Sequence, residues 1–254
     1  MRTLLRLSAA LACAFAAPAF AQINIGAGST FDFGDAAINF GCSDLIVAGQ
    51  ATASGALTGL RDLSIAPGGG FAVGSGQIAL GGNFSNGGAF SAGTGTVGIV
   101  DACGSGVSQV SGSTNFYRFA ASSGTGKQLV LPANVTQSVA NSLVLTGVVG
   151  HLLQVLSSTP GQRAELNLAP GAAQTIAYVS ARDNAATGAT IAPGPPAAFN
   201  SADGGNLVNW FIGVVGGNGT IPTPVLGVLG QLLLLGGMLL VAWRMVRRHG
   251  DESA

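Results

Sequence analysis

Short segments that alternate apolar and polar residues recur along most of the chain, and they predict strands rather than helices. Segments at 37–40, 44–47, 62–65, 77–80 and 96–99 are each bounded by Gly, Ser, Asn or Pro, as strands separated by turns are. Their apolar residues Leu45, Leu63, Ile78 and Val97 recur at a step of about 15–19 residues, which is typical of a solenoid. The coils of a solenoid bury their apolar faces against one another. We therefore expect strands near these four residues to pair in parallel and in register.

The same pattern continues in the second half of the body. Strands are predicted at 128–131, 137–139, 142–145, 151–155, 165–168 and 175–179, and a last strand at 209–212 would close the body. The predicted ectodomain covers residues 22–215, and the glycine-rich stretch that starts at 216 is typical of a flexible spacer.

Residues 1–21 have the pattern of a secretory signal peptide. Arg2 and Arg6 precede an apolar stretch, and Ala19 and Ala21 are the small residues that a signal peptidase requires at its cleavage site. The mature chain is expected to begin at Gln22.

The C-terminal region has the pattern of a membrane anchor. Residues 225–243 form an apolar run long enough to cross the bilayer as one helix. Arg244, Arg247 and Arg248 follow at once, and the positive-inside rule places them in the cytoplasm. This predicts a transmembrane helix at 225–243, a basic cytoplasmic tail at 244–254, and a spacer at 216–224 outside the membrane. The expected location is the inner membrane, with the ectodomain in the periplasm and onward display at the cell surface.

Composition narrows the class of protein further. Only 8% of the residues are charged, with ten basic against ten acidic, so no positive field attracts nucleic acid. The 41 glycines disfavour a helical body, because an interior glycine costs a helix roughly 1 kcal/mol relative to alanine.

Two cysteines, Cys42 and Cys103, remain in the exported part of the chain, and two arguments about them conflict. An exported compartment permits a disulfide. However, the two residues are separated along the chain by three to four coils. At ~4.8 Å per coil they would be roughly 15–20 Å apart, beyond the ~7 Å that a disulfide can bridge. The geometric argument favours two free thiols.

Candidate chemistry in the ectodomain is sparse. Asp44 and Asp62 occupy equivalent positions of successive repeats, so they would stack as an acidic ladder able to hold a cation or, more simply, to be solvated at the strand edge. His151 opens an apolar strand without a serine or aspartate motif beside it, and the other carboxylates, Asp101 among them, are scattered singly. We therefore expect no catalytic residues, no metal site and no cofactor.

One tract of the ectodomain carries a family resemblance. Residues 82–97, GNFSNGGAFSAGTGTV, resemble the G-N-W-x-N-x-G-x-F-x-x-G-x-G-T-V stretch of secreted bacterial surface proteins. Segments 110–117 and 156–161, Tyr178-Val179 with Asp183, and Asn209-Trp210 also occur in those proteins. The resemblance implies a right-handed parallel β-helix of adhesin-like type.

The tail carries a second resemblance. Ile221, Pro222, Thr223 and Pro224, followed by the apolar helix and the arginines, resemble the IPTL-type C-terminal sorting signal of Gram-negative bacteria. The chain departs from that signal at Pro224, where the class has leucine. The resemblance implies a membrane cysteine peptidase, an exosortase, as a partner that recognises this motif. The alternative interpretation of these residues is a proline-rich spacer next to the membrane.

These features predict a secreted, membrane-anchored surface protein of structural or adhesive type that is not an enzyme. Its expected partners are the membrane, the sorting peptidase and a surface polysaccharide or protein ligand. Two alternatives remain open, a carbohydrate-active β-helix enzyme (lyase or hydrolase) and a protein that assembles the extracellular matrix. Convergent Asp and Glu residues with a Lys or Arg in a groove would favour the enzyme.

Overall fold

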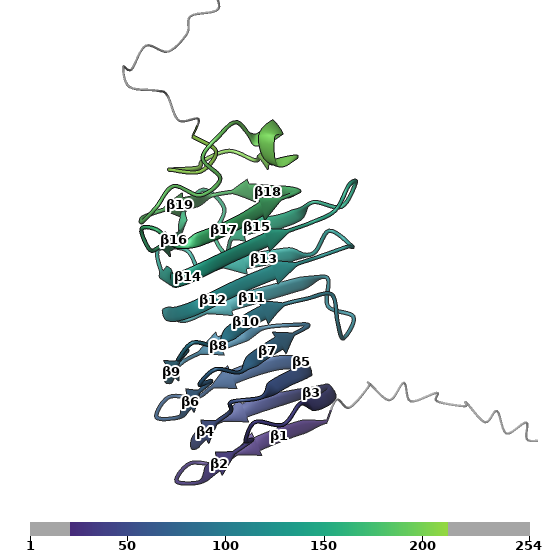
Figure 1. Cartoon of the computed structure of the whole chain (residues 1–254), viewed down its shortest axis with the longest axis vertical. Helices are drawn as coiled ribbons and strands as arrows, with labels where there is room; N and C mark the ends of the chain where they lie inside the picture. The colour runs from purple at the N-terminus through teal and green to yellow at the C-terminus, as the bar shows by residue number, and fades with distance from the viewer. Residues whose placement is uncertain (1–20, 213–254) are drawn as a thin grey trace, which may run out of the picture. The chain divides into compact units, whose positions relative to one another are not determined.

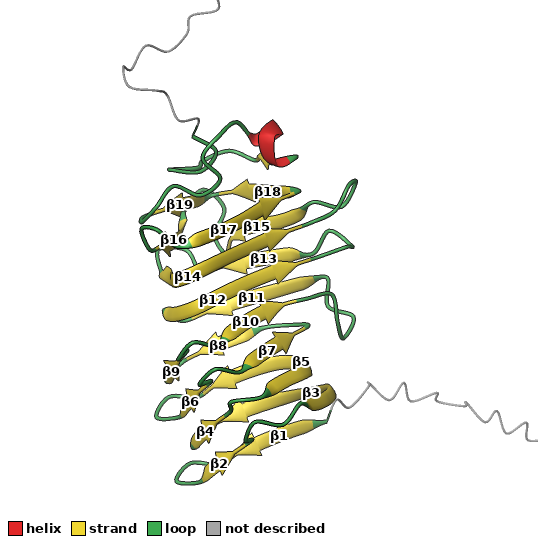
Figure 2. Ribbon diagram, in the orientation of Figure 1, coloured by secondary structure: helices red, strands yellow, loops and turns green. Residues whose placement is uncertain are grey.

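The structure is a computed structural model, and it describes residues 21–212. Within that range the chain is all-β and winds as a parallel β-solenoid of about eight turns (Figures 1 and 2). The rest of the predicted leader, the spacer and sorting motif, the predicted helix at 225–243 and the arginine tail lie outside the described residues. No helix in 21–212 has the length and apolar character needed to cross a membrane.

Each coil passes through three sides, named here side 1, side 2 and side 3 in chain order, and the strands that stack on each side pair in parallel. Side 1 stacks the first halves of β3 (Ile38–Val47) and β5 (Ala56–Ile65), β7 (Gln77–Leu80), β10 (Thr96–Ile99), the second halves of β12 (Thr114–Ser122) and β14 (Thr136–Thr146), and β17 (Ala173–Ala177).

Side 2 stacks β1 (Gln22–Ile25), the second halves of β3 and β5, β8 (Phe84–Asn86), β11 (Val107–Ser111), β13 (Gln128–Leu131), β15 (Leu153–Ser157), β18 (Val179–Arg182) and β20 (Ala202–Asp203). Side 3 consists of two groups of paired strands. The first is a four-stranded sheet of β2 (Thr30–Asp32), β4 (Gln50–Thr52), β6 (Gly70–Ala72) and β9 (Ala89–Ser91), and the second contains the first halves of β12 and β14, β16 (Ala164–Leu168) and β19 (Asn184–Ala186).

The parallel pairing predicted from the spacing is confirmed, but one step of the predicted register is wrong. Leu45 pairs with Leu63 on side 2, and Ile78 pairs with Val97 on side 1. Leu63, however, pairs with Phe84 in the next coil, and Ile78 pairs with Leu57 in the preceding coil. The apolar segments of sides 1 and 2 have the same alternating pattern, so the predicted step from Leu63 to Ile78 joined two different sides of the solenoid.

Because apolar and polar residues alternate along each strand, the apolar side chains point into the solenoid. There they stack on the equivalent side chains of the neighbouring coils. One such column on side 1 runs through Ile78, Val97, Phe119 and Leu143, which pair in sequence and are all buried. Burying a side chain of this size contributes roughly 1.5–3 kcal/mol. The shared interior explains why no coil needs a core of its own.

The two ends of the described solenoid differ. At the C-terminal end, residues 191–212 with the short 3-10 helix η1 (Pro196–Phe199) fold over the last coil, and Trp210 and Phe211 are buried there. The strand predicted at 209–212 does not form, because Trp210 makes only an isolated parallel bridge to Ile191. At the N-terminal end Ile23 and Phe31 are exposed.

Candidate functional site

Cys42 and Cys103 form a disulfide, with their Cα atoms 5.3 Å apart, so the expectation of two free thiols is wrong. That expectation assumes that each cysteine lies at the same position along the solenoid axis as the coil to which it belongs. Cys103 instead lies in the loop 100–106 between β10 and β11, which runs back along the solenoid across the turns of earlier coils. Its Sγ is 3.9 Å from the carbonyl oxygen of Gly59 and 3.8 Å from that of Leu60, two coils earlier.

A glycine makes room for this loop. A Cβ atom at Gly81, in the turn after β7, would lie 2.3 Å from the carbonyl oxygen of Ala102. No other residue fits there without displacing the loop, since that distance is far below van der Waals contact. Gly81 therefore allows loop 100–106 to lie directly on the preceding coil and bring Cys103 within reach of Cys42.

A carboxylate fastens loop 100–106 to the next loop, 123–127, which joins β12 to β13. Oδ2 of Asp101 accepts hydrogen bonds from Ser123 Oγ (3.1 Å), Gly124 N (2.7 Å) and Thr125 N (3.0 Å). Ser123 Oγ in turn accepts from the backbone of Thr125 and Lys127 at 3.2 and 2.9 Å. Burial by itself raises the pKa of Asp101, but these hydrogen bonds outweigh it and hold that pKa below its usual value.

A buried ammonium ties the same loops to the interior. Lys127, the only lysine of the chain, is 1% exposed. Its Nζ donates to the carbonyl oxygens of Gly81 (2.7 Å) and Ser105 and to Ser108 Oγ (3.2 Å). An ammonium has three donors, and here each has an acceptor. One side chain thus links turns of three consecutive coils.

The contact between Ser108 and Lys127 resembles a catalytic Ser–Lys pair in its residue types, but its surroundings do not suit that chemistry. Both residues are buried, at 0% and 1% exposure, so no substrate reaches the hydroxyl. The ammonium is hydrogen-bonded to two carbonyls and is not available as a base. The arrangement is a structural link.

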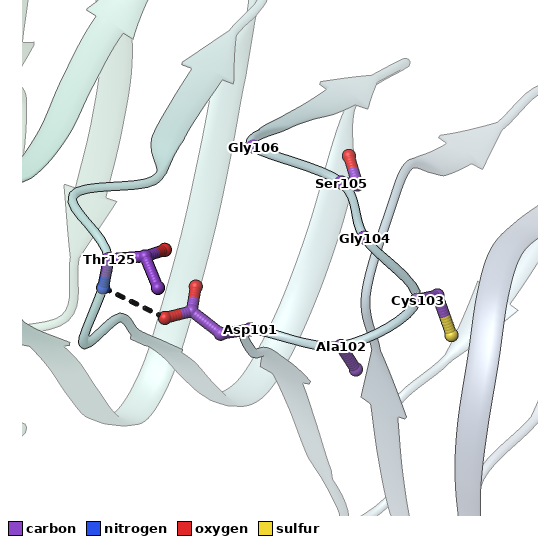
Figure 3. Close-up of a pocket in the computed structure, with 7 residues that line it drawn as sticks. All are labelled: Asp101, Ala102, Cys103, Gly104, Ser105, Gly106 and Thr125. Carbon is purple, nitrogen blue, oxygen red and sulfur yellow. Dashed lines mark hydrogen bonds between the residues drawn. The ribbon is translucent and has the colours of Figure 1, made fainter.

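Two open hollows lie along the edge formed by these loops. The first, of about 430 Å³, is lined by loop 100–106 and Thr125 (Figure 3). The second, of about 340 Å³, includes Thr125 and Gly126 and is completed by Gly150, His151, Leu152, Gln154 and Ser180. Thr125 belongs to both, so the hollows adjoin. We call the turns 100–106, 123–127 and 147–152 the loop edge.

The predicted acidic ladder exists, but its oxygens are already occupied. Asp62 lies one coil after Asp44, and its backbone N–H donates to Asp44 Oδ1 (3.3 Å). Arg61 donates to both carboxylate oxygens of Asp44, and its Nε lies 3.4 Å from Asp62 Oδ2. The pattern then continues along the solenoid, since Asn83 N donates to Asp62 Oδ1 and Gln109 N to Asn83 Oδ1, at 2.6 and 2.8 Å. These side chains therefore join successive coils.

His151 is exposed and lies in the loop before β15, where its backbone pairs with Val148. No group of three or more His, Cys, Asp or Glu side chains that could hold a metal ion occurs within 21–212.

Of the predicted processing residues only Ala21 is described. It is exposed, its carbonyl accepts from Asp44 N (3.0 Å), and β1 begins directly after it. Ala19, the tetrapeptide 221–224 and the three arginines lie outside the described residues.

The class that the fold defines is a disulfide-linked parallel β-solenoid. Comparison of the chain with known protein families, curated proteins and solved structures found no match.

No motif in the sequence singles out Lys127 or Ser123, and Asp101 stands there as an isolated carboxylate. Two weaker signals point to them. The step from Phe84 to its partner Val110 is longer than the step from Leu45 to Leu63, which marks an insertion at the loop edge. The only lysine of the chain also stands immediately before an apolar strand.

Replacing Asp101 with asparagine is expected to reveal an acid-dependent contribution to stability. Because the folded pKa of Asp101 lies below the usual 3.8, its carboxylate stabilises the fold fully above that value. The contribution is lost as the pH falls through the folded pKa. The urea midpoints of wild type and Asp101→Asn should therefore differ at pH 7 and converge as the pH is lowered below 3.8. A difference that stays constant over this range would contradict this role.

Proposed function

We propose that this protein is an exported β-solenoid, anchored at the inner membrane and displayed at the cell envelope, with a structural or adhesive role. The Cys42–Cys103 disulfide is the observation that carries the proposal. Disulfides persist in oxidising compartments and are rare in the cytosol. A disulfide in the solenoid is consistent with export directed by the predicted signal peptide at 1–21, whose cleavage point lies just before β1.

We further propose that the role is binding rather than catalysis, and that the solenoid is right-handed. The Ser–Lys contact is sealed from solvent, whereas the loop edge presents open hollows between fixed loops. Fixed surface loops on a rigid scaffold are common sites of recognition.

The right-handed winding of the solenoid is supported by the strong preference of crossovers between parallel strands, about 98% of which are right-handed.

The tail completes the proposal. The run at 225–243 would hold the chain in the membrane, with Arg244, Arg247 and Arg248 in the cytoplasm. The tetrapeptide at 221–224 would lie just outside, where a membrane sorting peptidase could recognise it. Its prolines favour an extended conformation for the residues that precede them, which keeps the motif separate from the helix.

Mass spectrometry of the protein from its native cell tests export and processing together. We expect an N-terminus at Gln22, a disulfide-linked peptide pair containing Cys42 and Cys103, and a C-terminus near 221–224. A chain that starts at Met1 with both thiols free would overturn the export proposal. Full retention of residues 225–254 would overturn sorting and leave a permanent anchor.

Two sets of variants separate anchoring from sorting. Replacing Pro222 and Thr223 with alanine should leave the chain in the membrane fraction and abolish C-terminal trimming. Replacing Arg244, Arg247 and Arg248 with glutamine should instead weaken retention and orientation in the membrane. If the Pro222 and Thr223 variant is trimmed like wild type, the motif is only a spacer.

A further inference from the structure

The loop edge combines an open surface with an unusually fixed backbone. Loop 100–106 contains no strand or helix, yet it is held by the disulfide at Cys103, by the hydrogen bonds of Asp101 and by the ammonium of Lys127 bound to Ser105. A corner turn of a solenoid does not require three such links. Fixing a loop before binding lowers the entropy cost of binding.

We propose that the two adjoining hollows of the loop edge form one groove that binds an extended, neutral oligosaccharide. This inference rests on the binding role proposed above and names the ligand class of that role. The polar groups, the charge and the geometry of the groove each support it.

The groove offers hydrogen-bonding groups that suit sugar hydroxyls. Asp101, which lines the first hollow, uses Oδ2 for its hydrogen bonds to the neighbouring turn (Figure 3). In the second hollow Gln154 and Ser180 sit side by side on paired strands, and within residues 21–212 neither side chain has a hydrogen-bond partner. A carboxylate, an amide and a hydroxyl can each accept from a sugar hydroxyl.

The charge of the groove favours a neutral ligand. Among the lining residues Asp101 is the only carboxylate and no Lys or Arg side chain is present. The nearby Lys127 is buried and its ammonium is already bound. Phosphates, uronic acids and nucleic acids would therefore meet a negative charge without a compensating positive one.

The shape of the groove favours a sugar chain over a peptide. Gly104, Gly106 and Gly150 line it, and a Cβ at any of these positions would have no atom within 4 Å, so a ligand can approach the backbone closely. The lining residues described here form no free strand edge and no deep apolar pocket of the kind that peptides use. Successive coils rise by ~4.8 Å, close to the length of one sugar unit in an extended chain, so neighbouring sugars would meet equivalent positions of neighbouring coils.

The test uses the full chain, exported and purified from membranes in detergent, on an array of neutral hexasaccharides (cello-, manno- and chitohexaose) with hexagalacturonate as the charged comparator. We expect retention of at least one neutral hexasaccharide and none of hexagalacturonate. Gly106→Leu should fill the first hollow and reduce retention by about tenfold or more, the loss of one to two good contacts. Its backbone is not in the left-handed region and nothing obstructs its Cβ, so the fold should persist.

Gly26→Leu is the matched control, because Gly26 also has an ordinary backbone and a nearly open Cβ position, 4.0 Å from Ser29 Oγ, in a turn of the first coil. It should bind like wild type and melt at the same temperature as Gly106→Leu. Failure to retain any neutral hexasaccharide, preference for hexagalacturonate, or equal retention by both variants would overturn the groove. Those results would leave the proposed export and display intact, since these are judged by the termini, the disulfide and protease access from outside the cell.

Discussion

Replacing Cys42 and Cys103 together with serine is expected to lower the free energy of unfolding of the solenoid by about 4 kcal/mol. The disulfide joins residues at a sequence separation of 61, and closing a loop of this length removes considerable entropy from the unfolded chain. The loss should appear as a lower urea midpoint, followed by circular dichroism. The same shift should follow when wild type is treated with dithiothreitol.

The reduced wild type and the double serine variant serve as controls for each other. If dithiothreitol shifts wild type but leaves the variant unchanged, the effect belongs to the disulfide and not to the serine side chains. A double variant that unfolds at the same urea concentration as oxidised wild type would show that the bridge does not constrain the folded solenoid.

Replacing Lys127 with methionine is expected to destabilise the protein by about 1–3 kcal/mol. Methionine fills a similar volume but leaves the Ser105 carbonyl without its donor and the Gly81 carbonyl with the Ser108 hydroxyl alone (3.3 Å), and an unpaired buried group costs about 1–3 kcal/mol. Removing the buried charge offsets part of this loss. Arg182→Met is the control, because Arg182 is an exposed cation whose loss should change stability by ~0.5 kcal/mol or less.

The pH dependence of the same variant provides a second readout. Burial lowers the pKa of Lys127 below 10.5, although the charge of Asp101 opposes part of that shift. The unfolded chain therefore binds the proton more tightly, and wild type gains stability relative to Lys127→Met as the pH rises from the folded pKa toward 10.5. A stability difference that does not change over this range would contradict the burial of the charge.

Amine labelling tests the same point without a substitution. Because Lys127 is the only lysine, an amine-reactive reagent should label the folded mature protein at its N-terminus alone. Unfolding in urea should add one further label. Rapid labelling of Lys127 in the folded protein would show that the ammonium is accessible.

The fold could be predicted because the alternation of apolar residues and the glycine-bounded spacing are themselves the cause of the coil. The register could not, because the segments around Leu57 and Leu63 show the same pattern although they face different sides. Spacing along the chain identifies neighbours only when every coil has the same length. On side 2 the step from Phe84 to Val110 is longer than the step from Leu45 to Leu63, so the coils are unequal.

The candidate site could not be predicted from the sequence, for a different reason. A disulfide is excluded on spacing only if every residue lies at the height of its own coil, whereas the insertion at 100–106 carries Cys103 back toward Cys42. Lys127 and Asp101 acquire their roles from carbonyls and backbone N–H groups of other coils. The neighbouring residues in the sequence do not identify such partners.

The position of the disulfide also determines how the solenoid would respond to mechanical load. A pull on the C-terminal end, where the proposed anchor attaches, detaches the last coil first, since each coil is held mainly by its neighbour. Unwinding would continue from η1 toward β11 and then meet the covalent link between Cys103 and Cys42. While the disulfide is intact, the segment between Cys42 and Cys103 cannot be extended to its full length. The coils formed by this segment would therefore remain folded under load while the later coils unwind and extend.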